Sequence, residues 1–114
     1  MEVNMKLAVI GSRNLTNIIL DQYVSGEVKE IVSGGAVGVD SCAAEYAKKM
    51  GLKLTEFLPQ YERYGRAAPI VRNKEIVDYA DKIVVFWNGS SKGTLSVIKY
   101  AERIGKPFEV ILCE

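Results

Sequence analysis

The chain contains no histidine, and this absence excludes several kinds of chemistry. Without an imidazole there is no histidine-dependent catalytic triad, no histidine general base and no side chain of the type that binds zinc most often. The two cysteines, Cys42 and Cys113, are too few and too far apart for a disulfide framework or a metal cluster, and both are expected to be small buried residues. Any chemistry must use carboxylates, hydroxyls, arginine or the backbone, and we expect neither a metal nor a cofactor.

The chain also lacks an excess of charge and a long apolar segment. It has 15 basic and 14 acidic residues, a formal net charge of +1, so no overall field attracts it to nucleic acid or to membranes. No apolar run approaches the roughly 18 residues of a membrane span, and residues 1–6 carry no secretory pattern. We therefore expect a cytoplasmic protein with no membrane partner. The length of 114 residues and the apolar fraction of 48% suit one globular domain, residues 1–114.

Apolar segments of strand length alternate with segments of helical spacing along the chain. Strands are predicted at 6–10, 30–33, 53–58, 82–87 and 108–112. Helices are predicted at 15–24, 37–50, 70–79 and 95–104. This alternation predicts an α/β fold: a single Rossmann-like domain with a parallel sheet of about five strands flanked by helices. The strand at 82–87 is the most apolar and is expected at the sheet centre. The connection at 59–69 is expected to be irregular and functional.

The stretch Ile31 to Asp40, Ile-Val-Ser-Gly-Gly-Ala-Val-Gly-Val-Asp, runs from a predicted strand through a glycine turn into a predicted helix. Glycines let a ligand approach main-chain N–H groups, and a helix N-terminus attracts anions, most often phosphate. The alternative is a tight strand-to-helix connection without a ligand. Turns at 11–13 and 88–94 also follow predicted strands. In a parallel sheet all three turns lie at the carboxyl edge, where ligands bind.

None of these turns matches the dinucleotide or P-loop motif, so the prediction of a phosphate site depends on their convergence. The candidate phosphate-binding residues in the turns are Gly11, Ser12, Arg13, Ser33, Gly34, Gly35, Ala36, Gly38, Asn88, Gly89, Ser90, Ser91, Lys92, Gly93 and Thr94. Arg13 would pair with phosphate or with a surface carboxylate. Asp40 would contact a ribose hydroxyl or only complement the helix dipole. Ser90, Ser91 and Thr94 would donate to phosphate or cap the following helix.

The segment 59–66 interleaves tyrosines with arginines. Tyr61 and Tyr64 offer π-faces for a base and Arg66 offers a phosphate clamp, so we predict a lid over the ligand. A dimer contact without a ligand role is the alternative. Arg72 and Asn73, at the start of the next predicted helix, are further ligand-binding candidates.

Three motifs in order resemble the SLOG superfamily, which joins DprA (Smf), the LOG phosphoribohydrolases and the YpsA-like proteins. They are Ser33-Gly34-Gly35-Ala36-Val37-Gly38-Val39-Asp40, Arg72-Asn73 and Gly89-x-x-x-Gly93-Thr94. With Tyr64-Gly65-Arg66-Ala67-Ala68-Pro69 between them, the chain is most similar to small stand-alone YpsA-related SLOG proteins, over residues 6–111. The resemblance implies a Rossmann-like fold and a nucleotide or nucleotide-derived ligand over two glycine turns. It also implies a homodimer or higher homo-oligomer, with Tyr64 to Arg72 near the shared surface.

Two departures from the family leave the activity open. DprA-like proteins bind single-stranded DNA with a basic residue inside the first motif, where this chain has Val37. LOG enzymes have a glutamate where this chain has Val97. We therefore rank a nucleotide-binding module or sensor first, and second an N-glycosidic hydrolase of nucleoside monophosphates with Glu75 or Asp40 as the carboxylate. A single-stranded nucleic-acid binder comes third, and it would use Arg13, Arg63, Arg66, Arg72 and Lys92.

Overall fold

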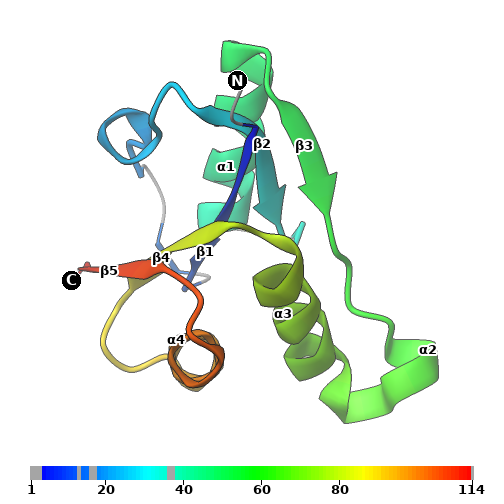
Figure 1. Cartoon of the computed structure of the whole chain (residues 1–114). Helices are drawn as coiled ribbons and strands as arrows, with labels where there is room; N and C mark the ends of the chain where they lie inside the picture. Colours follow the sequence, from blue (N-terminus) through cyan, green and yellow to red (C-terminus); the bar gives the residue numbers. More distant parts are fainter. Residues whose placement is uncertain (1–3, 13, 16–17, 36–37, 114) are drawn as a thin grey trace.

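The protein folds around one parallel sheet of five strands in the order β3-β2-β1-β4-β5. Figure 1 shows the fold in a computed structural model, which describes residues 4–12, 14–15, 18–35 and 38–113. The strands are β1 (Met5–Gly11), β2 (Val28–Ser33), β3 (Lys53–Glu56), β4 (Lys82–Trp87) and β5 (Phe108–Leu112). All four pairings are parallel. The predicted α/β class, Rossmann-like single domain and five-stranded sheet are confirmed.

Helices cover both faces of this sheet. The α-helices are α1 (Val39–Met50), α2 (Tyr61–Tyr64), α3 (Ala68–Tyr79) and α4 (Lys92–Ile104), and the 3-10 helices are η1 (Asp21–Tyr23) and η2 (Gly65–Ala67). Figure 1 shows α1 on one face, and α3 and α4 on the other. Successive side chains of β1 point to opposite faces of the sheet. Leu7 and Val9 pack in the core under α1, while Ala8 and Ile10 pack with α3 and α4.

The strand order reverses between β1 and β4. The chain moves from β1 outward to β2 and β3, then returns to form β4 and β5 on the other side of β1. The connections that follow β1 and β4 therefore leave the sheet in opposite directions at its carboxyl edge, where open α/β sheets form a crevice for ligands. The strand at 82–87 is buried between β1 and β5, but the central position belongs to β1, so that prediction is wrong in placement.

The predicted helix at 15–24 is wrong within the described residues, where only the short η1 forms. Threonine, asparagine, isoleucine and aspartate give this segment weak helix propensity. Its apolar residues do not form one helical stripe: Leu15 and Leu20 are buried in the core, while Ile19 is 73% exposed. Thr16 and Asn17, the residues of this segment suited to cap a helix, lie outside the described residues. The apolar spacing here reflects side chains that reach the core from non-helical backbone.

Other boundaries differ by a few residues. The segment 59–69 is not irregular throughout, because it forms α2 and η2 before α3 begins at Ala68, with Pro69 in the first turn. The third strand ends at Glu56, and α4 begins three residues earlier than predicted, at Lys92. Both cysteines are half-buried rather than buried. The strands at 82–87 and 108–112 have the predicted bounds.

Candidate functional site

A polar cavity lies at the carboxyl edge of the sheet, where the strand order reverses. Its volume is about 190 Å³. The turns after β1, β2 and β4 all contribute to its wall, together with the first turns of α1, α3 and α4. The lining residues are Ile10, Gly11, Ser12, Gly34, Asp40, Pro69, Arg72, Asn73, Ile76, Ser91, Gly93 and Thr94. Residues from three distant turns therefore meet in one place.

Not every candidate residue reaches the cavity wall. The turn residues that do not line it are Ser33, Gly35, Gly38, Asn88, Gly89, Ser90 and Lys92. The lid candidates Tyr61, Tyr64 and Arg66 do not line it either, nor does Glu75. Figure 1 shows α2, which carries both tyrosines, at an outer corner of the molecule. Arg13 and Ala36 lie outside the described residues.

Arg72 connects α3 to the turn after β2. Its Nη1 donates to the carbonyl of Gly34 at 2.9 Å and to that of Phe57 at 3.4 Å, while its Nε donates to Oδ1 of Asn73 at 2.8 Å. A Cβ on Gly34 would lie 2.6 Å from Nη1 of Arg72 and 3.1 Å from Oδ2 of Asp40. Gly34 is therefore needed for the close approach of the guanidinium, and a cation and a carboxylate share this part of the wall.

Ser12 links the turn after β1 to the turn after β4. It is 2% exposed, and its N–H donates to the carbonyl of Phe86 at 3.1 Å. Its Oγ accepts the N–H of Asn88 at 3.3 Å. Only glycine fits at the adjacent position 11, because a Cβ on Gly11 would collide with the side chain of Val39 at the start of α1. These contacts hold the ends of β1 and β4 together below the cavity.

The turn before α4 caps the helix and leaves its first turn accessible. Oδ1 of Asn88 accepts the N–H groups of Ser90 and Ser91, both at 2.9 Å, and Oγ of Ser91 accepts the N–H of Thr94 at 3.3 Å. Ser91 is thus the N-cap, which is one of the two roles that the sequence left open. The N–H groups of Lys92 and Gly93 make no hydrogen bond to any described residue. They lie at the positive end of the helix dipole, beside the cavity.

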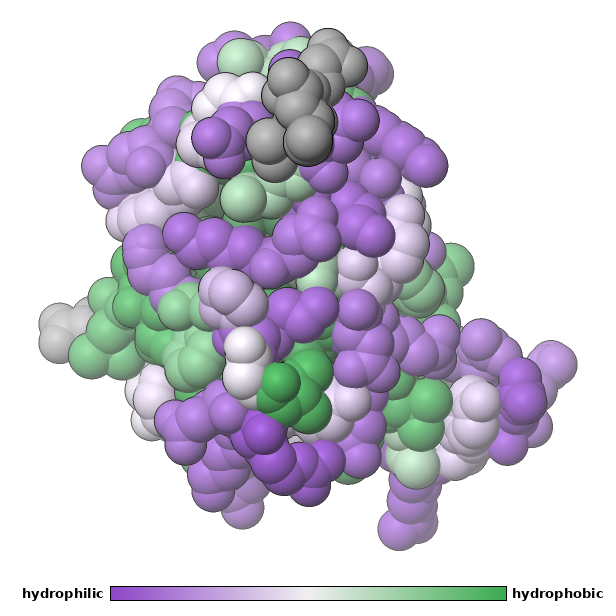
Figure 2. Space-filling view, viewed as in Figure 1, coloured by the Kyte–Doolittle hydropathy of each residue, from purple (hydrophilic) through white to green (hydrophobic). Residues whose placement is uncertain are grey.

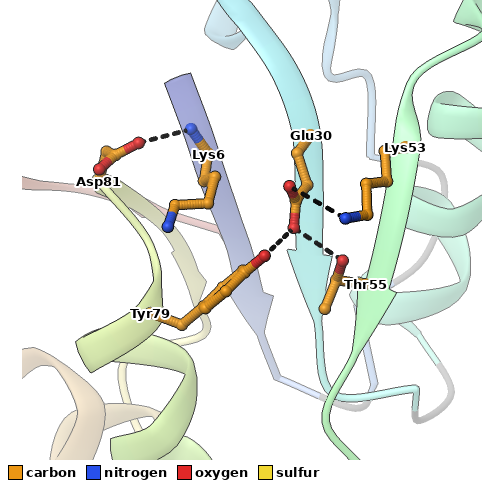
Figure 3. A network of polar contacts seen from close by, with 6 residues as sticks. All are labelled: Lys6, Glu30, Lys53, Thr55, Tyr79 and Asp81. Atoms are coloured by element: carbon orange, nitrogen blue, oxygen red, sulfur yellow. Dashed lines mark hydrogen bonds and ion pairs between the residues drawn. The ribbon is translucent and has the colours of Figure 1, made fainter. Parts of the chain in front are cut away.

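A second polar network lies at the far end of α3 and is shown in Figure 3. Oε2 of Glu30, on β2, accepts from the hydroxyl of Tyr79 at 2.6 Å and from Oγ1 of Thr55 at 2.7 Å. Nζ of Lys53 lies 3.9 Å from Oε1 of Glu30, and Nζ of Lys6 lies 4.1 Å from the centre of the Tyr79 ring. This network fastens the end of α3 to the sheet and so fixes the helix that carries Arg72.

The network changes the pKa of both central groups. Burial alone would raise the pKa of Glu30, but the hydrogen bonds from Tyr79 and Thr55 and the nearby lysine charges outweigh it, so the pKa is lowered. The hydrogen bond to Glu30, followed by burial, raises the pKa of Tyr79. Neither Glu30 nor Tyr79 was a candidate on the basis of the sequence. The available signal was a glutamate inside an otherwise apolar strand, since a buried carboxylate needs partners.

Sequence reasoning also missed three residues that line the cavity. Ile10 ends β1, Pro69 is in the first turn of α3, and Ile76 belongs to the core under that helix. Ile10 and Ile76 fell within a predicted strand and a predicted helix, and Pro69 fell within the connection 59–69, so none of them was a ligand-binding candidate. Nothing in their residue types distinguishes a cavity wall from ordinary core, so only the packing of α3 against the strand ends identifies them.

Among the described residues, no group of three or more cysteine, aspartate or glutamate side chains is placed to hold a metal ion. In the same part of the chain, no helix combines the length and the apolar composition needed to cross a membrane. Comparison of the chain with models of known protein families, with curated proteins and with solved structures found no match. What the structure defines is a Rossmann-like protein with a polar cavity at the reversal of strand order.

Proposed function

We propose that this protein binds a nucleotide or a nucleotide-derived phosphorylated ligand in the cavity, as a binding module or sensor. The observation that carries the proposal is the meeting of two anion-attracting groups at one cavity: the accessible first turn of α4 and the guanidinium of Arg72. A phosphate in the cavity would accept from the N–H group of Gly93, which lines it at the start of α4. Arg72 keeps its positive charge while its N–H groups bond to carbonyls, and Asp40 would accept from a ribose hydroxyl.

The resemblance to the SLOG superfamily supports the same ligand class. Each of the three motifs that carry the resemblance contributes to the cavity wall. The motif residues in that wall are Gly34, Asp40, Arg72, Asn73, Gly93 and Thr94. Motif residues 33–40, 72–73 and 89–94 are remote in sequence, so their meeting at one cavity favours a shared binding role over separate structural roles.

The size of the cavity limits which part of the ligand enters it. Pockets that enclose a drug-sized ligand have volumes of about 300–1,000 Å³. This cavity of about 190 Å³ suits a phosphate and its sugar. The base of a nucleotide would then extend beyond the cavity wall.

Hydrolysis of the N-glycosidic bond ranks second. Val97, at the place of the LOG glutamate, is 1% exposed in the core under α3 and α4, and Glu75 does not line the cavity. Among the described residues that line the cavity, Asp40 is the one with a carboxylate. Cleavage through an oxocarbenium-like state needs a placed carboxylate, so Asp40 is the better candidate if turnover exists. Binding of single-stranded nucleic acid ranks third, because neither Arg63 nor Arg66 lines the cavity.

The binding proposal is tested best at Gly93. A Cβ at this position meets no atom within 4 Å, so Gly93→Leu introduces a side chain beside the cavity whose Cβ has open space. Titration calorimetry with adenosine monophosphate should show at least a tenfold loss of affinity, roughly the loss of one or two charge-assisted hydrogen bonds. Gly35→Val is unsuitable, because Gly35 has φ +68° and its Cβ would lie 2.5 Å from Cδ2 of Leu58.

Gly26→Leu is the matched control, since a Cβ on Gly26 also meets nothing within 4 Å and the residue does not line the cavity. It should bind as the wild type does. If Gly93→Leu binds adenosine monophosphate as tightly as the wild type does, the first turn of α4 is not part of the binding site. Failure of the wild-type protein to bind any nucleoside monophosphate would reject the proposal.

We also propose that the chain forms a homodimer or a higher homo-oligomer through the region around α2. Exposed apolar side chains support this: Leu58 is 62% exposed and Tyr61 is 56% exposed. A second copy that covered them would bury surface that is unfavourable in water.

A further inference from the structure

A basic groove runs along the outer side of α3 and α4, next to the cavity. Its volume is about 490 Å³. The lining residues are Ile70, Lys74, Lys92, Leu95, Ser96, Lys99, Tyr100 and Arg103. Half of them are cations and none is a carboxylate, although the whole chain has a net charge of only +1. Positive charge is therefore concentrated here, and in Figure 2 hydrophilic side chains cover α4 in the lower part of the view.

These cations are not neutralised by ion pairs. The side chains of Lys74, Lys92, Lys99 and Arg103 are exposed, and none forms an ion pair with another described residue. Hydrogen bonds from lysine or arginine to a phosphate are stronger than those between neutral groups. An anionic group in the groove would gain these contacts without breaking existing pairs.

Tyr100 makes the groove more suitable for anions than for bases. Its hydroxyl donates to Oδ1 of Asp78 at 2.7 Å, which fixes the ring. Nζ of Lys74 lies 5.6 Å and Cζ of Arg103 lies 5.3 Å from the ring centre. Because both cations are held beside the ring, a base that stacked on Tyr100 would compete with them. The groove offers positive charge rather than an open stacking surface.

The groove and the cavity are neighbours along both helices. Pro69 and Asn73 line the cavity, and the residues next to them, Ile70 and Lys74, line the groove. On α4, Gly93 lines the cavity and Lys92 lines the groove. A ligand that left the cavity between the first turns of α3 and α4 would enter the groove directly.

We propose that the ligand is a nucleotide with a second phosphorylated unit, which lies in the α3/α4 groove while the first phosphate occupies the cavity. This proposal rests on the proposed function, because it extends the same site. Three observations support it: the cavity of about 190 Å³ is smaller than pockets that enclose whole ligands, the groove adjoins it, and the cations of the groove form no ion pair with a described residue.

The test compares two ligands by calorimetry at low salt: adenosine monophosphate, and diadenosine tetraphosphate, which joins two adenosines through a phosphate chain. The wild type should bind diadenosine tetraphosphate about tenfold more tightly, the combined effect of a few exposed ion pairs, and salt should reduce this advantage. Lys74→Gln combined with Lys99→Gln should abolish the advantage and leave the affinity for adenosine monophosphate unchanged.

Lys29→Gln combined with Lys48→Gln is the matched control, since it removes the same charge from exposed lysines that do not line the groove. This control variant should still bind diadenosine tetraphosphate about tenfold more tightly than adenosine monophosphate. If adenosine monophosphate binds but diadenosine tetraphosphate binds no more tightly, or if the groove variant retains the advantage, the extension is wrong and the binding function stands. If neither ligand binds, both proposals are rejected.

Discussion

The guanidinium of Arg72 occupies the space that a side chain on Gly34 would need. Nη1 of Arg72 donates to the carbonyl of Gly34 at 2.9 Å, and a Cβ on that glycine would lie 2.6 Å from the same atom. The glycine that suggested an approaching phosphate thus also admits a cation from a helix 38 residues further along the chain. Gly34 and Arg72 act as one unit in the cavity wall, and their substitution should show it.

Gly34→Ala should destabilise the protein by about 0.5–1.5 kcal/mol, because the end of the Arg72 side chain must shift and its hydrogen bond to the Gly34 carbonyl weakens. Chemical denaturation measures this, with Gly26→Ala as the control, since its Cβ would meet nothing within 4 Å. Arg72→Ala in the Gly34→Ala background should cost much less than in the wild type. Additive losses would show that the two residues are independent.

Tyr79→Phe should destabilise the protein by about 1–3 kcal/mol. The change removes the hydroxyl that donates to Glu30 at 2.6 Å and leaves a buried carboxylate with fewer partners. Tyr61→Phe is a suitable control, because the Tyr61 side chain is exposed and makes no hydrogen bond to a described residue. Equal stability of Tyr79→Phe and the wild type would mean that the network does not fasten α3.

The lowered pKa of Glu30 also predicts how stability depends on pH. Its carboxylate is stabilised in the folded state, so the contribution is present above the ordinary glutamate pKa of about 4.3 and is lost as pH falls through the lower folded-state pKa. Urea denaturation from about pH 6 to about pH 3 should show the gap between wild type and Glu30→Gln narrowing toward acid. A gap that stays constant or widens would contradict this assignment.

We expect no release of adenine from adenosine monophosphate at an enzyme-like rate, of which about 10 s⁻¹ is typical. The buried Val97 cannot stabilise a positive charge or activate water. Chromatographic assay of free adenine measures the rate, with Asp40→Asn and Glu75→Gln compared with the wild type. Rapid turnover that disappears in either variant would make the protein a hydrolase and identify its carboxylate.

Sedimentation at micromolar concentrations should show a dimer or a larger assembly. Leu58→Ser combined with Tyr61→Ser should shift the protein toward monomer, because it removes apolar surface next to α2. Leu112→Ser is the control: this residue is 65% exposed, at the end of β5, where Figure 2 shows apolar surface in another part of the molecule. A monomeric wild type would contradict the proposed oligomer. If only Leu112→Ser shifts the protein toward monomer, the interface lies at β5 and not at α2.

The sequence by itself determined the order and type of the sheet-forming elements. The apolar segment at 82–87 formed a strand with the predicted bounds, because an interior strand covered on both faces needs apolar residues at nearly every position. The edge strand at 108–112 also has the predicted bounds, although Glu109, Val110 and Leu112 are exposed. Alternation with helices then implied a parallel sheet, and the glycine turns implied a common edge. In the same way the motifs at 33–40, 72–73 and 89–94 predicted a shared location, and residues of all three line one cavity.

Only the tertiary structure decided what each of these residues does there. Gly34 contacts Arg72 because α3 brings that side chain to the turn after β2. Ser91 caps α4 because its Oγ accepts the N–H of Thr94. The sequence alone did not distinguish these roles from contact with a ligand. The same holds for the pairing of Glu30 with Tyr79, 49 residues away, and for the adjoining groove between α3 and α4. Local sequence specifies backbone preference and polarity, but contacts between remote segments depend on how helices pack against the sheet, which no local pattern encodes.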